Sequence, residues 1–163
     1  MEIFEFDGQK YKKASGHQKE WGTKIISGLN LVGRESILDL GCGDGVLTKQ
    51  LAGLVPDGRV LGIDASAGMI EAAKELEEKN LSFMCVDINK IDFDNEFDLI
   101  FSNAVLHWVK DHGRLIKNCR HALRQNGILR FNFAGDGNCS NFFEVITQVM
   151  IEPAFSKYYV DFE

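Results

Sequence analysis

The segment ILDLGCGDG, residues 37–45, is the part of the sequence that decides the fold. Its first four residues form a short, mostly apolar run, which is typical of a strand buried in a parallel sheet. The next five carry glycine at every second position, Gly41, Gly43 and Gly45, and lead straight into a helical pattern. A strand that turns into a helix through such a loop predicts an α/β sheet with a ligand site beyond the carboxyl end of the strand.

Short apolar runs alternate with helical patterns along the chain, which is typical of a Rossmann-like parallel sheet with helices on both faces. We expect an all-parallel sheet of order 3-2-1-4-5. The helix after the second strand is expected to be capped by Ser66, and the helix that contains Leu115 and Leu123 is expected to stop at Asn126-Gly127. The expected strands cover residues 37–40, 60–63, 83–86, 99–101 and 128–133.

Length and charge limit the class of protein. With 163 residues, 45% of them hydrophobic, the chain suffices for one core but not for two ordinary domains. We expect a single domain, residues 1–163, with an N-terminal helix at about 10–30, a core at about 34–135 and a C-terminal helix at about 140–155. Its 18 basic and 24 acidic residues give a net charge of −6, which disfavours nucleic acid and favours a small-molecule partner.

The sequence also suggests a location. The first ten residues, MEIFEFDGQK, contain neither a cationic region nor an apolar stretch. No other run approaches the roughly 20 apolar residues that cross a bilayer. We therefore expect a cytoplasmic protein without a membrane partner. The cysteines form no CxxC pair, so free thiols are expected and no metal ligand is assigned. The sequence leaves the oligomeric state open.

Acidic residues accompany three of the expected strands. Asp39 stands two residues before the first glycine, Asp64 ends the second strand, and Asp87 ends the third. Any one of them alone would be interpreted as a solvated strand end, but three together favour a site. Asp64 stands where a ribose diol would bind, and the G-x-G-x-G spacing differs from the G-x-G-x-x-G that binds a pyrophosphate. The charge of Asp39 suits an ammonium or a sulfonium group.

The chain resembles class I S-adenosylmethionine-dependent methyltransferases over roughly residues 10–150, through ILDLGCGDG, VLGIDAS, FMCVDI, FDLIFSNAVLHWV and LRQNGILRFNF. The resemblance implies S-adenosylmethionine as the cofactor and S-adenosylhomocysteine as its product. It implies that the three glycines shape the turn under the cofactor, that Asp39 lies near the methionine ammonium and that Asp64 binds the ribose. The other implied cofactor contacts are Ala65 and Met69 on the adenine, Asp87 and Ile88 at its edge, and Asn103.

The acceptor is expected at residues 102–108, SNAVLHW, which follow the fourth strand. This segment lacks the Pro-Pro motif that DNA amino-methyltransferases share. It resembles the trans-aconitate, malonyl-acyl-carrier-protein and juvenile-hormone-acid methyltransferases, as does the segment Tyr11 to Trp21. That resemblance implies a carboxylate acceptor, which is already ionised at neutral pH and needs orientation rather than a base. The indole N–H of Trp108 and the amide of Gln18 would hold it.

Several alternatives stay open at this stage. Trp108 also fits an aromatic lid and Gln18 an exposed helix residue. His107 fits a packed or capping residue, or a general base if the acceptor is a phenol, an amine or a carbon acid. A nicotinamide-dependent reductase is disfavoured by the glycine spacing and by the lack of a Tyr-x-x-x-Lys pair.

The resemblance also implies a difference at the C-terminus. Family members continue beyond the fifth strand and its helix into a terminal antiparallel strand pair, which this sequence lacks before it stops at Glu163. The chain is therefore expected to be either a fragment of a longer protein or a short member whose fifth strand is an edge covered by the last helix or by a partner. A non-catalytic binding module with this fold remains an alternative for the same reason.

Overall fold

The computed structural model describes residues 16–160; residues 1–15 and 161–163 lie outside the described part. The chain divides into two compact units, Met1–Phe133 and Ala134–Glu163, which are described separately below. The expectation of a single domain over the whole chain stays a prediction.

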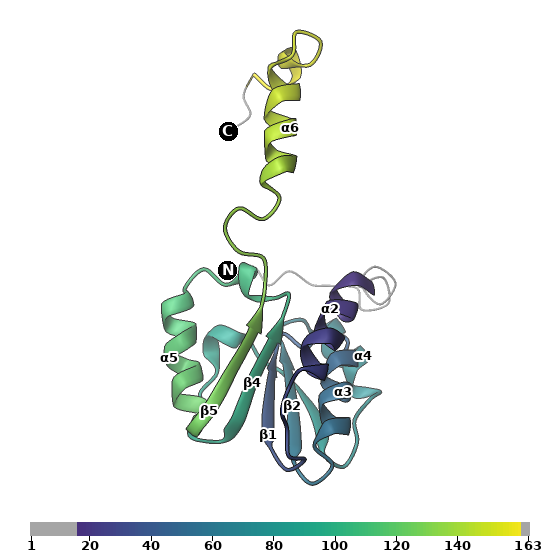
Figure 1. The fold of residues 1–163 in the computed structure, drawn as a ribbon, viewed down its shortest axis with the longest axis vertical. Coiled ribbons are helices and arrows are strands. Elements are labelled where there is room, and N and C mark those ends of the chain that lie inside the picture. The colour runs from purple at the N-terminus through teal and green to yellow at the C-terminus, as the bar shows by residue number, and fades with distance from the viewer. Residues whose placement is uncertain (1–15, 161–163) are drawn as a thin grey trace. The chain divides into compact units, whose positions relative to one another are not determined.

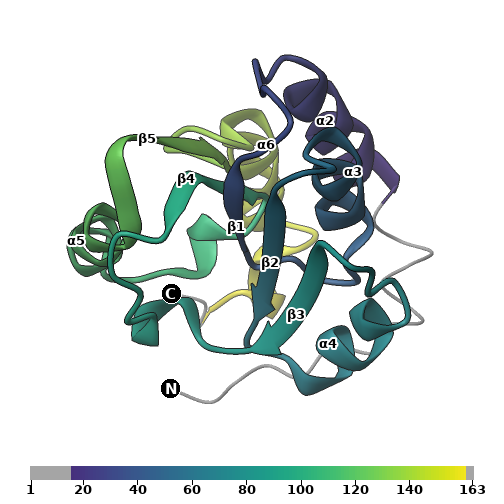
Figure 2. The ribbon, with the colours of Figure 1, turned by 90° about the horizontal axis from the view of Figure 1, so that it is seen from below.

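The first unit contains a five-stranded, all-parallel sheet of order β3-β2-β1-β4-β5, which confirms the predicted order (Figures 1 and 2). The central strand β1 is buried throughout because neighbours pair with it on both sides, with Ile37 between Val60 and Leu99. All five expected strands form, although β3 and β4 each start two residues before the predicted positions and β5 starts five residues before. The strands are β1 (Ser36–Leu40), β2 (Arg59–Asp64), β3 (Leu81–Cys85), β4 (Phe97–Asn103) and β5 (Leu123–Asn132).

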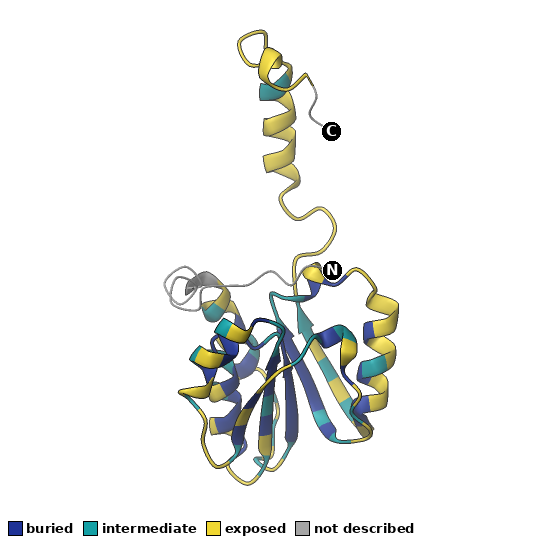
Figure 3. Ribbon diagram, turned by 180° about the vertical axis from the view of Figure 1, so that it is seen from behind, coloured by how far each residue is buried: buried dark blue, intermediate teal, exposed yellow. Residues whose placement is uncertain are grey.

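Helices cover both faces of this sheet, as predicted. The helices α2 (Gly16–Ser27), α3 (Val46–Leu54) and α4 (Ala67–Lys74) pack on one face through a core cluster that includes Ile26, Leu51 and Ile70. The other face carries α5 (His112–Ala122) and two 3₁₀ turns, η1 (Ile88–Lys90) and η2 (Leu106–Trp108). Figure 3 shows the buried inner strands between helices whose outer sides are exposed, whereas most of the edge strand β5 is not buried.

Local capping follows the sequence on the first face. The Ser66 side chain accepts a hydrogen bond from the backbone N–H of Met69 and caps α4, which confirms the predicted cap. On the other face, the connection between β3 and β4 holds only the short turn η1.

The junction of α5 and β5 differs from the prediction. The helix ends at Ala122 rather than at Asn126-Gly127, and β5 begins at Leu123. Leu123 is buried and pairs with Phe97 at the start of β4, so this distant strand ends the helix early. Asn126, with φ +66°, and Gly127 lie where the register between β4 and β5 shifts, and they form a strand irregularity instead of a helix stop.

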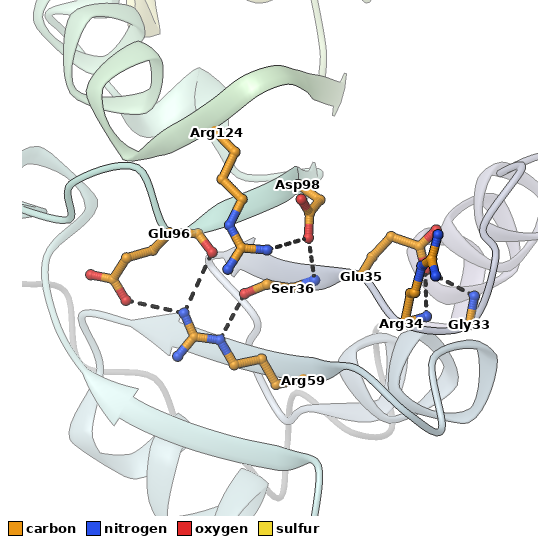
Figure 4. Close-up of polar contacts among 8 residues, drawn as sticks. All are labelled: Gly33, Arg34, Glu35, Ser36, Arg59, Glu96, Asp98 and Arg124. Carbon is orange, nitrogen blue, oxygen red and sulfur yellow. Dashed lines mark hydrogen bonds and ion pairs between the residues drawn. The ribbon is translucent and has the colours of Figure 1, made fainter.

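Polar side chains join the amino ends of the strands (Figure 4). The Asp98 carboxylate in β4 accepts hydrogen bonds from the backbone N–H of Ser36 in β1 and from Arg124 in β5, both at 2.8 Å. Arg59 in β2 donates to the Ser36 hydroxyl at 2.8 Å and forms an ion pair with Glu96 at 3.1 Å. This network ties four strands together at the edge of the sheet opposite to the predicted site.

The second unit contains the helix α6 (Ser140–Ile151) and the 3₁₀ turn η3 (Ser156–Tyr158). The helix lies within the region predicted for a C-terminal helix, and none of its residues is buried. Across residues 16–160, no helix combines the length and the apolar character needed to cross a membrane.

Candidate functional site

The candidate site lies at the carboxyl edge of the sheet. Connections leave β1 toward one side of the sheet and β4 toward the other, so the strand order reverses between these two neighbours. Open α/β sheets bind ligands in the crevice at such a reversal. The predicted residues lie around this reversal point of the strand order, which we call the crevice: the glycine loop follows β1, Asp64 ends β2 and Asn103 ends β4.

The glycine loop has a backbone that other residues rarely adopt. Gly41 and Gly45 have φ values of +71° and +77°. A Cβ on Gly41 would lie 2.5 Å from the Val105 side chain, and one on Gly45 would lie 2.7 Å from the Phe83 ring. Close packing within the protein therefore requires glycine at both positions, in addition to any approach of a ligand.

Asp64 is fixed beside this loop. One oxygen of its carboxylate accepts from the backbone N–H of Gly43 at 3.0 Å, and the other accepts from the backbone N–H of Ser66 at 2.9 Å. These bonds orient the carboxylate at the end of β2. An oriented acceptor in this position fits the hydroxyl groups of a ribose.

Asp39 lies beneath the loop rather than at its surface. Only 2% of the residue is exposed, and its carboxylate accepts from the Thr48 hydroxyl at 2.7 Å. Burial raises the pKa of Asp39 to about 7; the Thr48 hydrogen bond lowers this pKa, and the nearby Asp64 raises it. A bound cation near this carboxylate would favour its ionised form, so the residue fits the predicted ammonium partner.

Asp44 is a charged residue of the loop that the sequence analysis missed. It is 5% exposed and forms an ion pair with Lys19 of α2, whose side chain is 21% exposed. One signal in the sequence pointed to this pair. A lysine in the first turn of a helix is disfavoured by the helix dipole, and the first turn of α2 contains no acidic residue, so Lys19 needed a partner from elsewhere.

Asn103 connects three elements at the crevice. Its side-chain amide donates to the main-chain carbonyl of Gln18 in α2 at 3.0 Å and accepts from Asn132 of β5 at 2.8 Å. The next residue, Ala104, has φ +58°, a strained conformation for a residue with a Cβ. Strain of this kind persists where the surroundings enforce it, here through the 2.7 Å bond from the Ala104 N–H to the Asn132 carbonyl.

The residues predicted for the adenine are buried to different degrees. Ala65 is half-buried and Met69 is buried on α4, below the end of β2. The Asp87 carboxylate accepts from the backbone N–H and the side chain of Asn89 and so caps η1. Ile88 is buried in the core cluster on the other face of the sheet. Contact of these four residues with a cofactor stays a prediction.

The residues predicted to bind the acceptor make fewer contacts with one another than those of the glycine loop do. Trp108 is 63% exposed on η2, and its ring lies 5.4 Å from that of His107, tilted by 43°. The Gln18 side chain is exposed, and this residue reaches the crevice through its main-chain carbonyl. Among the described residues, no recorded contact joins the Trp108 indole to the Gln18 amide. His112 and His121 lie on the exposed side of α5.

The chain matches a known family and several relatives. Residues 38–131 match the model of a family described as a methyltransferase domain. The chain is 35% identical to the malonyl-[acyl-carrier protein] O-methyltransferase of Acetivibrio thermocellus over 135 residues, which cover 81% of this chain and 48% of the relative. It is 43% identical to the trans-aconitate 2-methyltransferase of Deinococcus radiodurans over 93 residues, which cover 57% of this chain and 35% of the relative.

A solved structure agrees with these matches. The S-adenosylmethionine dependent methyltransferase from Mesorhizobium loti aligns with a TM-score of 0.60 and 31% identity, over 69% of this chain and 51% of that one. The chain therefore spans about half or less of the length of these three proteins.

Proposed function

Since the chain belongs to the S-adenosylmethionine-dependent methyltransferase family, whose cofactor is S-adenosylmethionine, we propose that it methylates the carboxylate of a small molecule. The observation that carries the cofactor part of the proposal is the Asp64 carboxylate, held by two backbone N–H groups beside the glycine loop. The names of the two curated relatives, a malonyl-[acyl-carrier protein] O-methyltransferase and a trans-aconitate 2-methyltransferase, refer to acceptors that carry carboxyl groups and support the choice of acceptor.

In this proposal the carboxyl edge binds the cofactor. Asp64 accepts from the ribose hydroxyls, and Asp39 attracts the methionine ammonium through its charge beneath the loop. Gly41, Gly43 and Gly45 form the turn under the cofactor. The adenine lies against Ala65 and Met69, with Asp87 and Ile88 at its edge, and Asn103 borders the crevice.

The bound cofactor supplies a sulfonium methyl group, which passes to an acceptor oxygen while the carbon–sulfur bond breaks and S-adenosylhomocysteine remains. The protein has to orient the acceptor and exclude water. Trp108 and Gln18 donate hydrogen bonds to the carboxylate and leave its charge in place. The exposed indole of Trp108, beside the crevice strand β4, supports this role.

A second candidate function rests on the pairing of His107 with Trp108. With a phenol, amine or carbon acid as acceptor, His107 would accept the proton that the nucleophile loses. A non-catalytic binding module is the remaining alternative, because the chain covers only part of its relatives. The partner proposed in the first two cases is a small molecule, and the proposed location is the cytoplasm.

Two measurements test the proposal. Calorimetric titration with S-adenosylhomocysteine and, separately, NAD should show binding of the first ligand only. A methyl-transfer assay with labelled S-adenosylmethionine should then give base-labile esters with small carboxylic acids. Binding without transfer to any acceptor would support the binding module, and transfer to amines or phenols would support the second candidate.

A further inference from the structure

Two adjacent residues of α2 contact both borders of the crevice. The Gln18 carbonyl accepts from Asn103 at the end of β4, and the Lys19 ammonium pairs with Asp44 in the loop that follows β1. These two strands are the neighbours between which the strand order reverses. The first turn of α2 therefore spans the crevice from one border to the other; we name Gln18 and Lys19 the crevice bridge.

Further contacts hold this helix against the loop. The backbone of α2 comes so close to α3 that a Cβ on Gly22 would collide with Leu47 and would lie 3.1 Å from the Asn103 amide. The Thr23 hydroxyl lies 3.1 Å from the Gln50 side chain of α3. Since α3 continues directly from the glycine loop, any displacement of α2 changes the support of that loop.

The charge of Lys19 meets a group of carboxylates. Burial raises the pKa of the Cys42 thiol well above its usual range, and the negative charges of Asp39, Asp64 and Asp44 raise this pKa further. All three carboxylates are therefore close enough to Cys42 to make the loop electrostatically negative. Lys19 neutralises the one that belongs to the loop itself, Asp44. Without that cation a nearly buried carboxylate would remain unpaired, and the loop would have to move to hydrate it.

We propose that Lys19 is a positioning residue for cofactor binding: through its ion pair with Asp44 it fixes the glycine loop and keeps the first turn of α2 across the crevice. This inference deepens the proposed function and depends on it for the identity of the ligand. The bridge slows the departure of the cofactor and places Gln18 at the acceptor side. Lys19 itself touches neither the cofactor nor the acceptor.

The test is a double-mutant cycle on binding of S-adenosylhomocysteine. Lys19→Met and Asp44→Asn should each raise its Kd by about tenfold, with most of the change in the dissociation rate, and the double variant should bind no more weakly than either single variant. Lys19→Arg keeps the cation and should restore binding to within about threefold of the wild type. Lys24→Met is the matched control, because Lys24 lies on the same helix in an exposed pair with Glu20.

Each result separates the inference from the proposed function. Failure of the wild-type chain to bind S-adenosylhomocysteine would overturn the proposed function. Wild-type binding that Lys19→Met leaves unchanged, or additive effects of the two substitutions, would overturn the role of Lys19. If Lys19→Met does not fold, hydrogen exchange of the wild type decides: the amides of α2 should gain protection when S-adenosylhomocysteine binds, and unchanged exchange would overturn the inference.

Discussion

The Thr48 hydroxyl donates a 2.7 Å hydrogen bond to the Asp39 carboxylate. Asp39 lies in the central strand β1 and is almost completely buried, so this bond provides a polar partner in the interior. Burial raises the pKa of Asp39 to about 7, while an unfolded chain has a carboxyl pKa of about 3.9. Between these values the folded protein holds a proton that the unfolded chain has released. Stability supplied by this group must therefore fall as the pH rises from about 4 to about 7.

The first prediction uses Asp39→Asn, which preserves the size of the side chain and cannot titrate. The free energy of unfolding of the wild type, relative to this variant, should decrease between pH 5 and pH 7 by up to roughly 1.4 kcal/mol per pH unit. Urea unfolding at several pH values measures the difference. A difference that stays constant with pH would mean that Asp39 is ionised throughout. Thr48→Val removes the bond that lowers the pKa, so it should move the pH dependence to higher pH.

The second prediction concerns Asp64. A hydrogen bond to a charged group contributes about 1.5–3 kcal/mol, so Asp64→Ala should weaken S-adenosylmethionine binding by about tenfold to a hundredfold. Because Asp64 also accepts from Gly43 and Ser66, the same change should loosen the loop. Asp64→Asn separates the two effects, since its one carbonyl oxygen preserves part of the backbone bonding. Unchanged affinity in a folded Asp64→Ala variant would remove the ribose assignment.

The third prediction compares two glycines. Gly41→Ala introduces a Cβ 2.5 Å from Val105 in a left-handed conformation, so it should destabilise the fold by about 1–3 kcal/mol. Gly53 lies in α3, and a Cβ there meets no atom within 4 Å. Gly53→Ala should stabilise the protein by about 0.5–1 kcal/mol because alanine favours a helix. Thermal unfolding of both variants tests the contrast, and equal effects would contradict the close packing at Gly41.

The fourth prediction separates stability from binding. Asp98→Ala removes the acceptor that joins Ser36 and Arg124 at the amino edge of the sheet (Figure 4). The loss of these bonds should cost about 1–3 kcal/mol of stability. Binding of S-adenosylhomocysteine, measured well below the unfolding temperature, should stay within about twofold of the wild type because the site is at the opposite edge. A large loss of affinity would show that the two edges are coupled.

The sequence predicted the sheet and its order because local patterns encode them. The apolar run that begins at Ile37 and the glycines after it specify a buried strand and a turn without reference to distant residues. The helix that ends at Ala122 was mispredicted because the signal that ends it is not local. Leu123 becomes a strand residue through its pairing with Phe97, and Asn126-Gly127, a common helix stop, is used for a strand irregularity instead.

The candidate site also combines residues that local sequence patterns predict with contacts that depend on distant residues. Asp64 and the glycines lie where the chain reverses from strand to helix, so their positions follow from the sheet alone. The ion pair of Lys19 and Asp44 joins residues on separate elements, and the glycine-loop motif that contains Asp44 does not specify this partner. The same holds for the bond between Asn103 and the Gln18 carbonyl, which depends on how α2 packs. A pattern within one element can indicate that a side chain needs a partner, but it does not identify the partner on another element.

The last prediction concerns the acceptor. If Trp108 holds a carboxylate, Trp108→Phe should lower turnover by about tenfold or more, because it preserves an aromatic ring but removes the N–H, while affinity for S-adenosylhomocysteine stays unchanged. At saturating S-adenosylmethionine, where protonation of Asp39 no longer limits cofactor binding, the rate should then fall with acid only near a carboxylate pKa of about 4 and not near the roughly 6.5 of a histidine base. His107→Ala is the matched comparison, since its ring lies beside that of Trp108. A rate profile with a pKa near that of histidine, abolished by His107→Ala, would make His107 the base and would replace the carboxylate by an amine, a phenol or a carbon acid.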